Sequence, residues 1–179
     1  SDELQFLNMP NVRFCVSVEP ARYTSSGADA VEFLISANQG EEPRPLSKIA
    51  SGGELSRIML AMKSAFSGKY DIGTVIYDEI DAGISGLAAE KVGIKLKQTS
   101  RNSQVICVTH LAQIASAADN HLLIEKNVEA GRTFTAVKPL DFNGRVREIA
   151  RIMGGASITE AVLKSAEEMI TAKSGLTKD

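Results

Sequence analysis

The sequence of 179 residues contains no tryptophan, two histidines and 5% aromatic residues. It also lacks any run that approaches eighteen consecutive apolar residues, which excludes an ordinary membrane-spanning helix. Hydrophobic residues make up 44% and charged residues 23%, so a disordered or collagen-like chain is excluded as well. What remains is a globular chain long enough for one domain, or for one domain with a small second piece.

Cysteine is also scarce, because Cys15 and Cys107 are the only two and both lie in apolar, strand-like runs. Isolated cysteines in such runs are usually packed in the interior, so we expect two buried free thiols. The N-terminus lacks the charged-then-apolar pattern of a secretory signal. Together these features predict a protein of the reducing cytoplasm.

Neither sign of charge is in large excess, since 20 Lys and Arg stand against 22 Asp and Glu, for a net charge of −2. Residues 1–90 carry 7 basic and 13 acidic side chains, or −6, whereas residues 91–179 carry 13 and 9, or +4. This balance excludes a uniformly basic surface for nucleic acid but permits a local one. The basic residues of one predicted helix either contact DNA or form only its solvated face. They are Lys91, Lys95, Lys97 and Arg101.

Hydrophobic periodicity predicts strands and helices in turn. Residues 12–18 and 31–35 alternate apolar and polar side chains, so we expect a hairpin with one buried face, followed by an irregular loop over 36–52. The other predicted strands cover 74–77, 104–109, 121–126 and 132–138. The predicted helices cover 54–66, the stretch from the Gly83/Gly86 turn to about 98, the apolar stripe 146–153, and 157 to about 172, with Ser157 and Glu160 as a capping box.

The order strand, helix, strand over 74–109 is that of a crossover unit between parallel strands. Both strands are apolar throughout, which is typical of the buried interior of a parallel sheet. We therefore expect an α/β fold with a mainly parallel sheet flanked by helices, together with antiparallel hairpin strands.

Polar side chains follow both of these strands directly, with Asp78 and Glu79 after the first and His110 after the second. Ligands of such sheets bind beyond the carboxyl ends of the strands, and a carboxylate pair suits Mg²⁺ and a polarised water. Two plainer interpretations stay open at this point. Acidic residues before a helix cap it, and a lone histidine after a strand is often structural.

A third feature stands at the start of the predicted helix 54–66, where Ser51, Gly52, Gly53 and Glu54 follow one another. Free N–H groups, absent β-carbons and the positive end of the helix dipole allow a phosphate to approach closely there. Alternatively, the glycine pair only gives the chain a flexible turn into the helix.

Four ordered stretches of the sequence carry a resemblance to a known family. They are PLSKIASGGELSRIMLAMK (45–63), YDEIDAGISG (77–86), VTHLAQIASAADNH (108–121) and REIARIMGG (147–155). With them the chain resembles the C-terminal lobe of the ABC-type ATPases, the class that includes the SMC proteins, and within it the RecN family of bacterial DNA repair proteins. The resemblance covers nearly all of residues 12–172.

The resemblance implies roles for the glycine turn. Ser51, Gly52, Gly53 and Glu54 match the signature motif of the class, which binds the γ-phosphate of an ATP held mainly by the opposite head of a dimer. Glu54 stands where transporters commonly have Gln, as it often does outside them.

It also implies roles for the residues after the strands. Asp78 matches the position that holds Mg²⁺ through water, and Glu79 the position that polarises the attacking water. Asp81 falls in the segment that crosses the dimer interface. His110 matches the switch histidine, which contacts the γ-phosphate and the attacking water.

The phosphate-binding P-loop, Gly-x-x-x-x-Gly-Lys-Ser/Thr, occurs nowhere in the sequence. The resemblance places it in an N-terminal lobe beyond a long coiled coil, so we expect this chain to be half an active site and inactive alone. Residues 1–11 are then the exit from the coiled coil or a linker, residues 12–172 the lobe and residues 173–179 a tail. The first residue, Ser1 in place of Met, agrees with a piece of something longer.

The predicted function is therefore the C-terminal half of an ATP-hydrolysing head that acts in DNA double-strand break repair and recombination. Its expected partners are the N-terminal lobe, a second head and, through the full-length protein, DNA at the bacterial nucleoid. Two alternatives remain. One is a head lobe of another SMC or recombination ATPase, and the other is a non-catalytic interaction module in which Asp78 and Glu79 are only helix caps.

Overall fold

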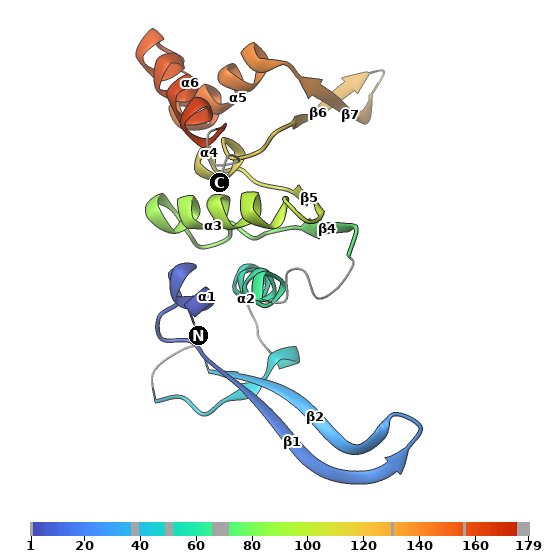
Figure 1. Ribbon diagram of the computed structural model, residues 1–179. Coiled ribbons are helices and arrows are strands. Elements are labelled where there is room, and N and C mark those ends of the chain that lie inside the picture. The colour runs from blue at the N-terminus through green and yellow to red at the C-terminus, as the bar shows by residue number, and fades with distance from the viewer. Residues whose placement is uncertain are drawn as a thin grey trace. The chain divides into compact units, whose positions relative to one another are not determined.

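The computed structural model describes residues 2–36, 40–48, 52–65, 72–129, 131–155 and 157–174. The chain divides into two compact units, which are taken in turn (Figure 1). The first unit comprises Ser1–Ile84 and Asn102–Val108, and the second comprises Ser85–Arg101 and Thr109–Asp179.

A long hairpin of strands β1 (Arg13–Thr24) and β2 (Gly27–Ser36) lies in the first unit (Figure 1). The predicted pairing is confirmed, with Val16 opposite Phe33. The predicted buried face is confirmed only at one end, because Ile35 is buried whereas Val16 is 50% and Phe33 is 43% exposed. The apolar side chains of the ribbon contact one another across the strands, as in the Phe14–Phe33 ring pair with centroids 5.6 Å apart.

The loop predicted over 36–52 is partly regular. Strand β3 (Arg44–Pro45) pairs antiparallel with β2, and a short 3₁₀ turn, η1 (Leu46–Lys48), follows it. Sequence reasoning missed both because Gly and Pro residues break the hydrophobic period over this stretch.

Two helices pack together in the first unit, α1 (Asp2–Phe6) and α2 (Gly52–Ala65) (Figure 1). In the turn after α1, Asn8 has a left-handed φ of 62°, and the N–H of Met9 donates to the carbonyl of Leu4 at 2.9 Å. Asn tolerates this conformation better than most residues, so it suits the end of a helix. Helix α2 begins two residues earlier than the predicted 54–66, and Phe66 lies outside the described residues.

Strands β4 (Thr74–Tyr77) and β5 (Gln104–Cys107) pair in parallel, as predicted. Their carboxyl ends are in register, since the N–H of Val108 donates to the carbonyl of Tyr77 at 2.9 Å. The expected burial of both faces is wrong for this pair, because Ile76 is 66% and Ile106 43% exposed, although Tyr77 is buried. Cys15 and Cys107 are free, as predicted, but half-buried.

The second unit contains α3 (Gly86–Thr99), α4 (Ala112–Ala115), the antiparallel hairpin β6 (His121–Glu129) and β7 (Arg132–Leu140), and helices α5 (Phe142–Gly154) and α6 (Glu160–Ser174). Helices α5 and α6 pack on one another (Figure 1) and enclose a small apolar core. Its buried members are Ala112, Val146, Ile149, Ala150, Ala166 and Ile170.

Two helices of this unit, α5 and α6, begin with a side-chain cap. Asp141 precedes α5, and its Oδ1 accepts the N–H of Gly144 at 2.7 Å. The predicted Ser157/Glu160 capping box of α6 is wrong: the helix begins at Glu160, and Thr159 Oγ1 accepts the N–H of Val162 at 3.3 Å. Across the ranges that the structure describes, no helix is long and apolar enough to cross a membrane.

Candidate functional site

The first turn of α2 packs directly on the chain that follows strand β4. We name residues 78–84 the acidic loop. A Cβ added to Gly53 would lie 2.7 Å from the Cβ and 2.9 Å from the carbonyl oxygen of Ala82. A Cβ added to Gly52 would lie 2.7 Å from Oε2 of Glu79. Gly53 therefore allows the helix and the acidic loop to approach more closely than a larger residue would permit, whereas a β-carbon at 52 would meet only the flexible end of the Glu79 side chain. Ser51, the predicted first residue of this turn, lies outside the described residues.

The acidic loop is a series of tight turns. Asp78 Oδ1 accepts the N–H of Glu79 at 2.9 Å, and the N–H of Ala82 donates to the carbonyl of Glu79 at 3.0 Å. Glu79 has a φ of 56°, which is unusual for a residue with a side chain. Such strain persists only where the surroundings fix the backbone, and it is often found at functional sites. The carboxylates of Asp78 and Glu79 are exposed, whereas Ile80 and Asp81 are buried.

The structure excludes one plain interpretation of the two exposed carboxylates. Helix α3 begins at Gly86 with Ser85 as its N-cap residue. Asp78 and Glu79 begin the acidic loop, and the rest of that loop separates them from Ser85. Asp78 bonds within the loop, so neither residue is the cap of α3.

Two side chains of α2 donate to the backbone of the acidic loop. Ser56 Oγ donates to the carbonyl of Asp78 at 3.0 Å. Arg57 Nη1 donates to the carbonyls of Ala82 at 2.9 Å and Ile80 at 3.4 Å. Arg57 is buried, and burial lowers the pKa of its guanidinium while nearby Glu54 acts in the opposite direction. The loop is thus tied to α2 by direct hydrogen bonds as well as by glycine packing.

The site is negatively charged. Burial, with Asp81 and then Asp78 nearby, raises the pKa of the Cys107 thiol to about 12. Burial and the neighbouring Cys107 raise the pKa of Tyr77 to about 12 as well. No three His, Cys, Asp or Glu side chains of the described ranges come together as a metal site. The exposed carboxylate of Asp78 fits one water-mediated contact to Mg²⁺, which needs few protein ligands.

His110 belongs to the second unit, where it is exposed and follows Val108, the residue whose N–H pairs with the end of β4. We name residues 109–120 the histidine segment. It turns at once, because Thr109 Oγ1 accepts the N–H of Leu111 at 3.1 Å. The short helix α4 lies within it.

Side chains from several elements bind the carbonyls of the histidine segment. Lys173 of α6 donates to the carbonyl of Gln113 at 2.6 Å, and burial lowers the pKa of this lysine. The ring Nε2 of His121 lies 2.8 Å from the carbonyl of Ala115, so this nitrogen carries the proton. Arg145 of α5 donates to the carbonyl of Ala118 at 2.5 Å.

Sequence reasoning missed these anchoring residues. Arg57 lies on a face of α2 that the hydrophobic pattern predicts to be polar and solvated, and no local signal marks it as buried. Lys97, one of the candidate DNA-contacting residues, is buried and pairs with Asp119, so it is not on a solvated face. These contacts join residues that are far apart in the sequence, so only the tertiary fold determines them.

The fold of this chain is similar to that of SMC head domains. The Smc head domain with a coiled coil and joint from Pyrococcus yayanosii is similar to this chain with a TM-score of 0.59 and 21% identity, over 88% of this chain and 28% of that one. The α/β class with parallel and antiparallel strands is thereby confirmed.

The chain is a relative of the RecN proteins. It is 47% identical to DNA repair protein RecN of Bacillus subtilis over 155 residues, which are 87% of this chain and 27% of that protein. It is 41% identical to DNA repair protein RecN of Vibrio cholerae over 174 residues, or 96% of this chain and 31% of that protein. The chain therefore spans about 30% of the length of these relatives. No protein-family model matches it.

Proposed function

We propose that this chain is the C-terminal lobe of the ATP-hydrolysing head of a RecN-like protein that acts in DNA double-strand break repair and recombination. One observation carries the proposal: the first turn of α2 and the acidic loop pack closely, through a contact of Gly53 with Ala82 that leaves no room for a β-carbon at 53. A phosphate-binding turn and a hydrolytic carboxylate are the two parts that such a lobe must supply.

The turn supplies backbone donors. The first N–H groups of a helix have no partner within the helix, and glycines leave them open to a phosphate. We assign Gly52, Gly53 and Glu54, with the preceding Ser51, to the γ-phosphate of an ATP held mainly by a second head. The buried Asp81 then lies in the part of the acidic loop that faces that second head.

The acidic loop supplies the hydrolytic groups. Asp78 is assigned to hold Mg²⁺ through water, and the metal supplies charge neutralisation when bound. Glu79 is assigned to accept a proton from the attacking water, and His110 to orient that water and the γ-phosphate. The left-handed φ of Glu79, 56°, supports a functional role, because backbone strain of this kind is concentrated at functional sites.

A companion lobe must supply the P-loop, since the sequence has none. Apolar side chains are exposed on β4, on β5 and directly after β5, at Ile76, Ile106 and Val108. This exposed apolar surface supports the need for a partner lobe that covers it. We therefore propose that the chain alone does not turn over ATP, and that its partners are the N-terminal lobe and a second head. DNA contact and association with the nucleoid belong to the full-length bacterial protein.

The test is Glu79→Gln in the full-length protein, with Glu32→Gln on the exposed hairpin as the matched control. Loss of a general base usually costs about 10²–10⁴-fold in rate, so turnover falls at least a hundredfold while ATP binding persists. The control keeps the parent turnover. Parent-like turnover in the Glu79 variant disproves the assigned role.

A second experiment separates the ATPase from a non-catalytic interaction module. The separately expressed N-terminal lobe is mixed with this chain, and binding of a fluorescent ATP analogue is measured. Binding that requires both pieces supports the proposal. A folded mixture that fails to bind nucleotide supports the interaction module.

A further inference from the structure

Arg57 is the one strongly basic side chain of α2 that the structure buries, at 7% exposed. Taking a guanidinium out of water is costly unless hydrogen bonds compensate for the lost solvation. Arg57 Nη1 makes two such bonds, to the carbonyls of Ala82 and Ile80. Its Nε is buried and makes no hydrogen bond within the described part of the chain. The two hydrogen bonds of the Arg57 side chain therefore both go to the acidic loop, while Glu54 acts on its charge from the same helix.

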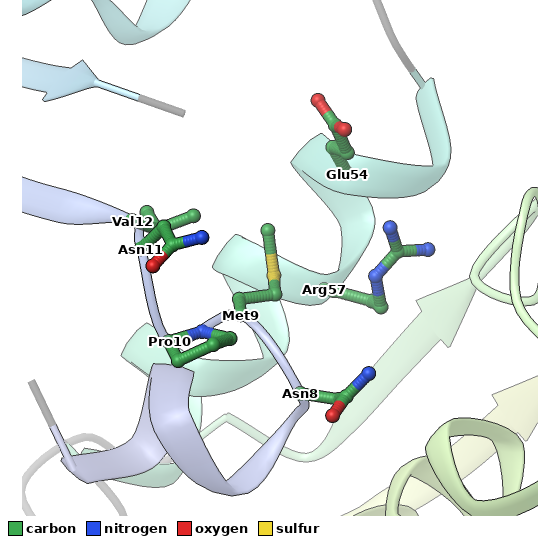
Figure 2. A pocket seen from close by; sticks show the side chains of 7 residues that line it. All are labelled: Asn8, Met9, Pro10, Asn11, Val12, Glu54 and Arg57. Atoms are coloured by element: carbon green, nitrogen blue, oxygen red, sulfur yellow. The ribbon is translucent and has the colours of Figure 1, made fainter. Parts of the chain in front are cut away.

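A cavity beside α2 shows that packing alone does not force this position. The cavity has a volume of about 230 Å³ and lies between α2 and the segment after α1 (Figure 2). Arg57 and Glu54 line it from the helix. An arginine has several rotamers, so this space offers the side chain another place to lie. Both of its hydrogen bonds nevertheless go to the acidic loop.

The two carbonyls that Arg57 binds belong to the residues on either side of Asp81. One of them, Ile80, comes directly after Glu79. Glu79 is strained at its φ of 56°, and its side chain is exposed. A strained, exposed residue keeps its conformation only where neighbouring backbone is fixed. The loop's own hydrogen bonds, Ala82 to Glu79 and Ile84 to Asp81, fix only its internal turns and do not fix it to the helix.

We propose that Arg57 is a positioning residue for hydrolysis: its guanidinium binds the carbonyls of Ile80 and Ala82 and thereby holds the Glu79 carboxylate in its working position relative to the first turn of α2. The inference rests on the proposed function. It assigns Arg57 no contact with nucleotide, water or metal. Its effect reaches the reaction only through the backbone of the acidic loop.

The test uses the full-length protein with Arg57→Met, Arg57→Lys and the control Lys63→Met, which removes a positive charge from the same helix. A small displacement of a catalytic group costs about tenfold to a hundredfold in rate. Arg57→Met thus lowers kcat about tenfold or more while KM for ATP changes less than threefold. Arg57→Lys, whose ammonium keeps the charge but not the planar fork, recovers part of kcat. Lys63→Met behaves as the parent.

Hydrogen exchange gives a readout that activity does not. Peptides over 79–84 exchange faster in Arg57→Met, while peptides within α2 keep the parent rate. Parent-like kcat with parent-like exchange overturns the proposal, and so does a rise in KM equal to the fall in kcat. If Arg57→Met does not fold, Arg57→Lys decides: slower turnover with faster exchange over 79–84 supports the proposal, and parent values overturn it.

Glu79→Gln, measured in the same series, separates this inference from the proposed function. Parent-like turnover in Glu79→Gln refutes the function and the positioning role together. Loss of turnover in Glu79→Gln with parent-like Arg57→Met refutes only the role of Arg57.

Discussion

The acidic loop and the histidine segment follow two strands that pair in parallel, yet the chain holds them in different ways. The acidic loop is bound from one helix, by Arg57 and Ser56, over glycines that permit close contact. The histidine segment is bound by Lys97 from α3, Arg145 from α5, Lys173 from α6 and His121 from β6. A segment with several anchors tolerates the loss of one, whereas a loop fixed from a single helix does not.

The charges around the two segments also differ. Beside the acidic loop, burial raises the pKa of Cys107, and the carboxylates of Asp81 and Asp78 add to this shift. Around the histidine segment the donors are mainly basic, and burial lowers the pKa of His121. Burial disfavours the charged form of both groups, so it raises the pKa of Cys107 and lowers that of His121. Four predictions test this comparison.

The largest expected effect on stability is that of Gly53→Ala. The added methyl group meets Ala82, whose backbone oxygen would lie 2.9 Å away, so helix and loop must separate. Overpacking of this kind costs about 1–3 kcal/mol, and urea unfolding of the chain measures it. Gly52→Ala is the matched control, since its methyl group meets only the flexible end of Glu79 and helix propensity favours Ala. Equal losses in the two variants would contradict the proposed close contact at Gly53.

The second prediction concerns the thiol beside the acidic loop. The thiolate is the reactive form, and a pKa raised to about 12 leaves little of it at pH 8. Alkylation of Cys107 by iodoacetamide is therefore expected to be at least about tenfold slower in the folded chain than in urea. Peptide-resolved mass spectrometry measures both rates.

The control for Cys107 removes one of the charges that raise its pKa. Asp81→Asn leaves burial largely unchanged but removes the carboxylate that raises the pKa of the thiol more than Asp78 does, so the folded chain reacts somewhat faster. Equal rates for the folded and unfolded parent would show that neither burial nor the acidic loop protects the thiol.

Most of the regular elements were predictable from the sequence, because their hydrophobic periods are clean. Examples are the strand at 74–77, the strands of the two hairpins, and the helix that starts at the glycine turn. The candidate site was predictable as a set of residue types, from motif order. Its geometry was not, since the contact of Gly53 with Ala82 and the hydrogen bonds of Arg57 join residues 23 or more positions apart. No local pattern encodes the direction in which an arginine leaves its helix.

The third prediction removes one anchor from the histidine segment. Lys173→Met deletes a hydrogen bond to the carbonyl of Gln113 but also a costly buried charge, so the net loss is about 1 kcal/mol. Lys164→Met, on the exposed side of the same helix, is the control. Hydrogen exchange over 112–119 rises only slightly in Lys173→Met and more when Arg145→Met is added. Complete loss of protection in the single variant would refute the idea of several independent anchors.

The smallest expected effect is the pH response of His121. Its neutral ring donates Nε2–H to Ala115, and burial lowers its pKa below the ordinary 6.5, with Arg145 adding to that shift. The unfolded chain therefore takes up a proton at a higher pH than the folded chain does. The neutral ring of His121 therefore makes its full contribution to the free energy of unfolding above pH 6.5. This contribution is lost as the pH falls below 6.5. The parent loses more stability between pH 7.5 and 5.5 than His121→Gln, whose amide donates to the same carbonyl without titrating. The difference is small because the ring is only half-buried, and urea midpoints at the two pH values measure it. If both proteins lose stability equally, protonation of His121 does not affect the anchoring of the histidine segment.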